Sequence, residues 1–209
     1  MVKKGENAPG STSRPFIYKM IKYQTHVQNI GWQGEKADGE MSGTTGQSLR
    51  LEAIKIQLSS SIDGGIVYKT HVHDYGWLNF VTNGQASGTT GQAKRLEAIQ
   101  MQLTGNAMNQ YDLYYRVHAQ NFGWLGWAKN GMIAGTINYD LKVEAYQVLL
   151  VPKGTPEISN GADASIQKPT SVQYSAHVQN IGWQNYVADG EMAGTTARNL
   201  RLEALKLKL

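Results

Sequence analysis

Residues 23–58 read YQTHVQNIGWQGEKADGEMSGTTGQSLRLEAIKIQL, and this stretch decides the fold because the chain repeats it. The pattern returns without a gap in residues 68–103, 115–150 and 174–209, so the 209-residue chain carries four repeats of 36 residues. Repeats 1 and 4 are identical at 24 of 36 positions, whereas repeats 1 and 3 share only 14. A fixed period of this size indicates an architecture built by packing copies of one supersecondary unit together.

Each repeat has the pattern of two half-buried strands separated by tight turns. Apolar and polar residues alternate in residues 23–27 and again in residues 54–58, and this period of two is typical of a strand with one buried face. The alternation places His26 opposite the apolar face and Glu52 on the apolar face, together with Ile54. An Asp-Gly or Asn-Gly pair in the middle of each repeat supplies the positive φ that a tight hairpin requires.

A repeat of three or four strands cannot bury its apolar face alone, but three repeats around a pseudo-threefold axis can. We therefore expect an all-β fold in which a triplet of repeats, residues 16–153, forms one β-prism-like domain, with a β-trefoil as the alternative. Residues 1–15 and 154–173 hold Pro, Gly and Ser and are expected to be linkers. The fourth repeat, 174–209, is then left over. It could pack on the triplet or join another chain, through homo-oligomers or swapped repeats, and this order of segments predicts a piece of a longer array.

Composition excludes several classes of protein. The absence of Cys excludes disulfides, thiolate zinc sites and thiol nucleophiles. No membrane insertion is expected, because the longest aliphatic run, 148–151, is far shorter than the roughly 20 residues of a membrane helix. The net charge is only +4 and the basic residues are scattered, which argues against nucleic acid. His71 and His73 could both touch a metal, but the pair occurs in repeat 2 alone, so no metal site is expected.

The polar residues recur in every repeat, whereas an enzyme needs one asymmetric set of reacting groups. We therefore expect a non-catalytic protein without catalytic residues or cofactors. The recurrence of the same polar residues in four repeats instead favours a scaffold or a binding protein with several equivalent sites.

Three segments of repeat 1, residues 26–32, 38–46 and 49–56, resemble the ChW family, the clostridial hydrophobic repeats with a Gly-Trp core. The resemblance covers all four repeats, and repeat 3 departs most, for example with Lys142 where the others have Arg. It implies a secreted or surface-attached bacterial protein of Gram-positive type, and a role in binding polysaccharide or surface partners. The expected location is therefore extracellular, at the bacterial cell surface.

The polar end of each repeat is the candidate binding site, because the end of the first strand meets the start of the last. A Trp offers a flat apolar face for a sugar ring, while amide, carboxylate and guanidinium groups bond hydroxyls. The candidate ligand-binding residues are Trp32, Trp77, Trp124, Trp127, Trp183, His26, His71, His118, Asn29, Arg50 and Glu52.

Structural roles compete with binding at these positions. A core anchor is the favoured interpretation of the repeated Trp, with stacking on a ligand as the alternative. Trp127 lies outside the repeat pattern and is the best candidate for an exposed aromatic. A structural partner such as Arg50 would explain Glu52, and a cross-strand hydrogen bond would explain His26.

The resulting hypothesis is a non-catalytic extracellular module that recognises bacterial cell-wall or extracellular polysaccharide through repeated Trp-centred sites. The alternative is a protein-interaction or structural spacer module of a surface protein, which assembles or swaps through its repeats. The partner is a polysaccharide in the first case and a surface protein in the second.

Overall fold

The computed structural model describes residues 19–168, 172–188 and 192–208. The linker predicted at 1–15 and the first residues of the predicted triplet lie outside these ranges. The chain divides between Ile166 and Gln167 into two compact units, which are described separately. Within the described ranges, no helix combines the length and the apolar character needed to cross a membrane.

Every repeat has the same order of strands, two long ones enclosing two or three very short ones. Repeat 1 contains β1 (Ile21–Val27), β2 (Gly31–Trp32), β3 (Lys36–Ala37), β4 (Ser42–Gly43) and β5 (Leu51–Leu58). Repeat 2 contains β6 (Gly65–Val72), β7 (Gly76–Trp77), β8 (Val81–Thr82), β9 (Ser87–Gly88) and β10 (Leu96–Thr104). After the short helix α1 (Ala107–Gln110), repeat 3 contains β11 (Tyr111–Ala119), β12 (Gly123–Trp124), β13 (Ala128–Lys129), β14 (Ile133–Ile137) and β15 (Val143–Pro152). Repeat 4 contains β17 (Gln173–Val178), β18 (Gly182–Trp183), β19 (Val187–Ala188) and β20 (Leu202–Lys208).

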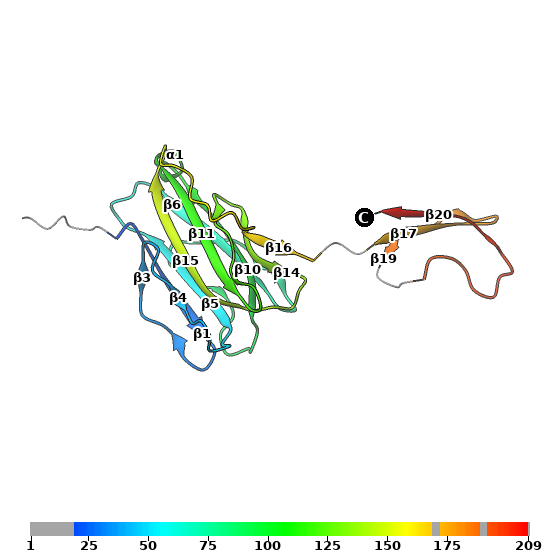
Figure 1. Ribbon diagram of the computed structural model, residues 1–209, viewed down its shortest axis with the longest axis horizontal. Helices are drawn as coiled ribbons and strands as arrows, with labels where there is room; N and C mark the ends of the chain where they lie inside the picture. The colour runs from blue at the N-terminus through cyan, green and yellow to red at the C-terminus, as the bar shows by residue number, and fades with distance from the viewer. Residues whose placement is uncertain (1–18, 169–171, 189–191, 209) are drawn as a thin grey trace, which may run out of the picture. The chain divides into compact units, whose positions relative to one another are not determined.

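Repeats 1 to 3 form three sheets, whose long strands β1, β5, β6, β10, β11 and β15 are labelled in Figure 1. These sheets exchange their short strands in a cycle. Within each repeat the first and last long strands are antiparallel neighbours. One short strand of each repeat pairs with a long strand of another repeat: β4 pairs with β15, β9 pairs with β5, and β14 pairs with β10. We call β4, β9 and β14 the exchange strands. The cycle closes after three repeats, which confirms the expected all-β, pseudo-threefold, prism-like fold. We call these three repeats the triplet.

One hydrophobic core unites the triplet and takes side chains from all six long strands. Buried tyrosines also tie one repeat to the next through hydrogen bonds. The Tyr68 hydroxyl accepts the Ile56 N–H at 3.0 Å, and the Tyr115 hydroxyl accepts the Met101 N–H at 3.1 Å. Each bond joins the first strand of one repeat to the last strand of the repeat before it. The alternation read from the sequence is therefore confirmed, with the Tyr face turned inward.

Alkaline pH should destabilise the triplet through these tyrosines. Burial raises the pKa of Tyr23 and of Tyr68 to about 12, because a buried phenolate would lose its hydration. Unfolded phenols ionise near the ordinary value of 10.0, so the unfolded state loses protons first as the pH rises. The contribution of these tyrosines to stability is therefore expected to be constant below about pH 10 and to fall between pH 10 and 12. Urea denaturation followed across this range, together with tyrosinate absorbance, measures the effect. A folded chain whose tyrosines all ionise near pH 10 would contradict it.

Part of the segment predicted as the linker 154–173 is a strand, β16 (Ser165–Gln167), which pairs with β14 at the edge of a sheet. The Ala164 carbonyl accepts the Gly135 N–H at 3.1 Å, and Ile166 packs against the hydrophobic core. Gly126 permits this close approach, because a Cβ there would lie 1.9 Å from the Ala162 carbonyl oxygen. The first compact unit consequently ends later than the composition alone predicted.

Candidate functional site

A β-bulge occurs at the Glu of every repeat. In repeat 1, His26 lies opposite Ala53 while the next residue, Val27, lies opposite Leu51, so Glu52 is an extra residue on its strand. The registers of the other repeats shift at the same point, at Glu97, Glu144 and Glu203. A bulge re-aims side chains in this way. It directs the carboxylate toward the outer face that carries the His.

The expectation that Glu52 lies on the apolar face with Ile54 is therefore wrong. Simple alternation fails because the bulge inserts one residue, so that Leu51 and Ile54 both reach the core although they are three positions apart. That spacing of two apolar residues is the sequence signal that could have indicated the bulge.

The Glu of each repeat contacts two cationic or ionisable partners, and it is buried in repeats 1 to 3 but exposed in repeat 4. Glu52 Oε1 accepts hydrogen bonds from Arg50 Nε at 3.0 Å and from a terminal nitrogen of the same guanidinium at 2.7 Å. His26 Nδ1 lies 3.0 Å from Glu52 Oε2. In repeat 4 the equivalent His177–Glu203 contact is a cross-strand hydrogen bond of 3.1 Å. The Arg partner predicted for Glu52 is thus confirmed. The cross-strand hydrogen bond predicted for the His occurs at His177 in repeat 4, whereas His26 Nδ1 lies close to Glu52 without a hydrogen bond.

The repeated Trp lies on the outer face, edge-on to the His of its own repeat. The ring centroids of Trp32 and His26 are 5.5 Å apart at an interplanar angle of 79°. Trp32 is 37% exposed and Trp183 is 43% exposed, while the other two repeat Trp are half-buried. The interpretation as core anchors is wrong, because the Gly-Trp strand pairs beside the His, on the face opposite the buried tyrosines.

Trp127 is not the most exposed of the additional aromatics. It is half-buried, whereas Phe80 and Tyr186 at the same repeat position are each exposed by almost half. Arg116 explains the difference, because its guanidinium carbon lies 4.7 Å from the Trp124 ring centroid and 4.6 Å from that of Trp127. The two rings and the cation form one cluster.

A cation lies over the indole in all four repeats, a feature that was not predicted from the residues alone. The distances from the cationic atom to the ring centroid are 4.3 Å for Lys55–Trp32, 4.8 Å for Lys69–Trp77, 4.7 Å for Arg116–Trp124 and 4.0 Å for Lys206–Trp183. These distances lie within the roughly 6 Å that defines a cation–π contact.

The cation changes strands between repeats while its contact with the indole remains. Lys55 and Lys206 belong to the last strand, whereas Lys69 and Arg116 belong to the first. The two positions face each other, as the cross-strand pairs Gln24–Lys55, Lys69–Gln100, Arg116–Gln147 and Ser175–Lys206 show. Each pair therefore has one cation and one neutral polar residue. A basic residue that occupies one or the other of two facing positions in every repeat is the signal from which the site could have been predicted, once the register was known.

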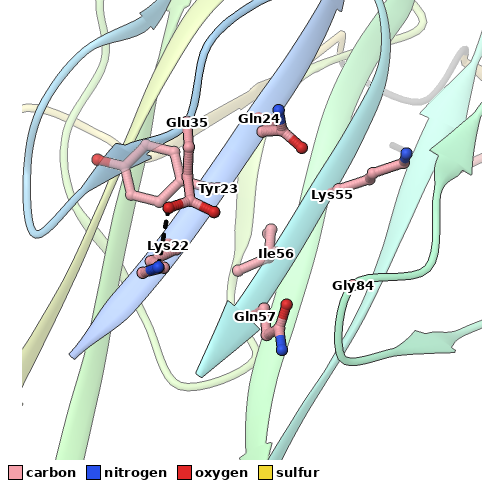
Figure 2. A pocket seen from close by; sticks show the side chains of 8 residues that line it. All are labelled: Lys22, Tyr23, Gln24, Glu35, Lys55, Ile56, Gln57 and Gly84. Carbon is pink, nitrogen blue, oxygen red and sulfur yellow. Dashed lines mark ion pairs between the residues drawn. The ribbon is translucent and has the colours of Figure 1, made fainter. Parts of the chain in front are cut away.

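A small open pocket lies beside Lys55, at the seam between repeats 1 and 2 (Figure 2). It is lined by Lys22, Tyr23, Gln24, Glu35, Lys55, Ile56, Gln57 and Gly84, and Lys22 and Glu35 form an ion pair of 3.0 Å across it. Its volume of about 60 Å³ corresponds to roughly two water molecules at ~30 Å³ each. Its lining joins residues of repeat 1 to Gly84 of repeat 2, so the pocket marks the boundary between these two repeats.

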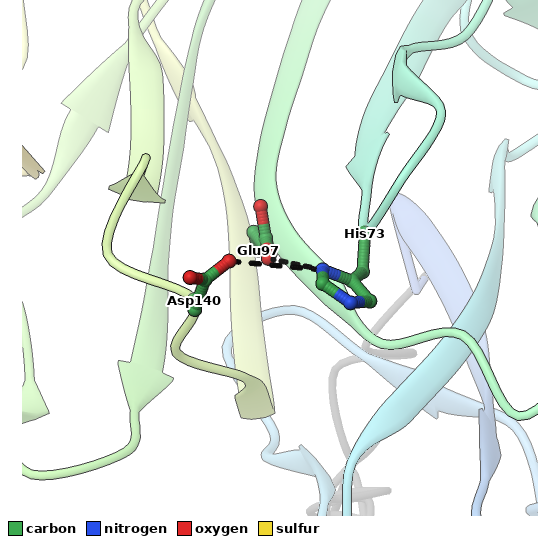
Figure 3. Close-up of side chains that lie close together, drawn as sticks. All are labelled: His73, Glu97 and Asp140. Atoms are coloured by element: carbon green, nitrogen blue, oxygen red, sulfur yellow. Dashed lines mark ion pairs between the residues drawn. The ribbon is translucent and has the colours of Figure 1, made fainter.

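His73, Glu97 and Asp140 gather where repeats 2 and 3 meet (Figure 3). The spacing of their ligand atoms, all within 4.8 Å, would suit a metal ion. The guanidinium of Arg95 lies in the same place, with a terminal nitrogen 2.7 Å from His73 Nδ1 and 3.0 Å from Asp140 Oδ1. The group is therefore an arginine-centred polar network that joins two repeats. His71 instead contacts the other Glu97 oxygen, at 3.0 Å.

Asn29 occupies a turn rather than the centre of the site. Its φ of 62° and that of 61° at Asn180 are left-handed, a conformation that Asn adopts more readily than most residues. Its inclusion among ligand-binding residues stays a prediction, as it does for the Trp, His, Arg50 and Glu52 side chains.

No curated protein and no solved structure matches the chain closely enough to inform its function. The model of the family described as Clostridial hydrophobic W matches four times, over residues 26–60, 71–105, 118–152 and 177–209. These matches cover more than half of the chain and coincide with the four repeats, each containing one His–Trp–Glu site. The chain belongs to the Clostridial hydrophobic W family of repeats, which are typical of surface proteins.

Proposed function

We propose that the chain is a non-catalytic, extracellular module that binds acidic polysaccharide of the bacterial cell wall or surface. The observation that carries the proposal is the cation over an accessible indole in all four repeats, retained although the basic residue changes strands. A structural role in a single strand would not require that compensation. A binding surface that needs one cation beside each Trp does require it.

The chemistry of the site suits an anionic sugar. The indole offers an apolar surface to a pyranose ring, and the adjacent ammonium or guanidinium offers a charge to a carboxylate or phosphate. The Glu beneath the site is not a repelling charge, because Arg50 and His26 already contact it in repeat 1. Weak sites repeated along one chain gain strength through effective concentration on a repetitive polymer.

Removing the four cations tests the proposal. The variant carries Lys55→Gln, Lys69→Gln, Arg116→Gln and Lys206→Gln. Its matched control carries Lys19→Gln, Lys36→Gln, Lys168→Gln and Lys208→Gln, which remove the same charge from described lysines that do not lie over an aromatic ring. Affinity electrophoresis in polygalacturonate, with neutral dextran as the comparison polymer, measures binding. The site variant is expected to lose about tenfold or more in affinity for the acidic polymer because four sites act together. The control should lose much less.

Two results would contradict the proposal. Equal losses in the two variants would indicate a general charge effect, which salt would screen in both. Absence of binding to polygalacturonate and to purified Gram-positive cell walls by the unmodified chain would remove the polysaccharide function itself. The spacer alternative would then account better for the repeats.

A further inference from the structure

Repeat 4 presents to solvent the face that repeats 1 to 3 bury. Leu202, Leu205 and Leu207 are each more than half exposed. Their counterparts in repeat 1 are Leu51, Ile54 and Ile56, and none of these is exposed at all. Three large apolar side chains on one short strand form a patch that soluble proteins ordinarily cover.

The segment of repeat 4 that corresponds to the short strands β4, β9 and β14 lacks the neighbour that those strands have in the triplet. In repeat 1 the Thr44 N–H donates to the Glu144 carbonyl of another repeat at 2.8 Å, and a Cβ on Gly43 would lie 2.4 Å from that oxygen. In repeat 4 a Cβ on Gly194 would meet nothing within 4 Å, and the described residues 192–194 form no strand. The two segments that pair in the triplet, Gly-Thr of one repeat and Glu-Ala of another, are both present in repeat 4, as Gly194-Thr195 and Glu203-Ala204.

We propose that three copies of this chain assemble through repeat 4 into a closed threefold domain that reproduces the triplet. The triplet supplies the precedent, because the same exchange of short strands between successive repeats closes after three. A head-to-tail interface that closes in this way forms a ring and not a filament. Repeat 1 shows that the sequence of repeat 4 suits the role, since 24 of 36 positions are identical.

The structure of the triplet indicates that the partners of repeat 4 are the fourth repeats of other copies of the chain. All three exchange strands of the triplet are paired within it, so it retains no matching exchange position for a fourth repeat. In the assembled ring Arg201 of one copy would lie near Asn199 of the next. The triplet shows this arrangement twice, where Arg95 bonds Asp140 and Lys142 bonds Ser48 at the same repeat positions. The inference concerns assembly and is independent of what the Trp sites bind.

Sedimentation equilibrium of the full chain over a range of concentrations tests the proposal. The expected result is a reversible equilibrium between a 23.0 kDa monomer and a trimer of three times that mass. Two variants, Gly194→Val and Leu205→Asp, should remain monomeric at every concentration. The first blocks the close approach of the exchange strand, and the second places a charge in the buried face.

Ile181→Asp is the matched control. Ile181 is exposed, but its counterpart Ile30 is still 51% exposed inside the closed triplet, so this side chain takes no part in closure. The control should form trimers like the unmodified chain. A chain that stays monomeric, one that stops at a dimer, or trimers that survive both Gly194→Val and Leu205→Asp would overturn the proposal. None of the substitutions lies in the triplet, so the triplet of each variant should stay folded. Circular dichroism checks this.

Discussion

Replacing Gly135 by valine is expected to lower the free energy of unfolding of the triplet by roughly 4 kcal/mol or more, a loss that only severe backbone or core damage produces. Gly135 lies in the exchange strand β14 of repeat 3, where it faces Ala98 of repeat 2. A Cβ there would lie 2.4 Å from the Glu97 carbonyl oxygen and 2.5 Å from the Ala98 Cα. Both atoms belong to the backbone of a paired strand, so neither yields without breaking the exchange.

Gly194→Val is the matched control for this prediction. The φ angles of the two glycines, 135° for Gly135 and 134° for Gly194, are almost identical, so both variants carry the same backbone strain. Only Gly135 has a neighbouring strand within reach of the new side chain. Calorimetry should show the main transition shifted far downward for Gly135→Val and unchanged for Gly194→Val. Equal shifts would mean that conformational strain, and not the close approach, explains why Gly occurs at this position in every repeat.

Glu52→Ala is expected to cost about 3–4 kcal/mol, because it leaves a half-buried guanidinium and a His without their counterpart. The Glu52 side chain is 7% exposed, and Arg50 and His26 both depend on it. Glu203→Ala removes the same residue from the same local sequence in repeat 4. The Glu203 side chain is 36% exposed and that of Arg201 is 75% exposed, so water replaces the lost contact at under about 1 kcal/mol.

Urea denaturation of both variants, fitted with a common m-value, gives the difference. Glu52→Gln separates charge from shape, since it keeps a hydrogen-bond acceptor beside Arg50 and should recover part of the loss. If Glu52→Ala and Glu203→Ala destabilise the chain equally, burial does not govern the strength of this contact. The His–Glu–Arg group would then have to be explained by binding.

Local pattern was enough to predict the strands and their pairing within a repeat. Alternation around Tyr23 and Ile54 identified both long strands and the face that each buries, and the Asp-Gly pair at Asp38 identified the hairpin. These features depend on neighbours along one or two adjacent strands, so a single repeat contains the information. The number three was indicated by the segments 1–15 and 154–173, which enclose three repeats.

The binding face could not be predicted in the same way, because its geometry depends on a register shift. The bulge at Glu52 reverses the orientation of the Glu, and alternation carried through it placed the carboxylate on the wrong face. The cation was missed for another reason. Lys55 and Lys69 lie on different strands of their repeats, and only the register shows that they occupy facing positions. Trp32 resembled a core residue because large aromatics usually provide a core, whereas here the tyrosines fill it.

The sequence by itself determined the repeat, its strands, its turns and the family to which the chain belongs. The tertiary structure decided which repeat lends its short strand to which, and therefore which faces are covered. The reason is physical: an exchange strand such as β14 is only a few residues long, and it is stable only when another repeat supplies its hydrogen-bond partners. Repeat 4 has nearly the sequence of repeat 1, yet Leu205 is exposed where Ile54 is buried. That difference comes from the neighbours of a repeat and not from its residues.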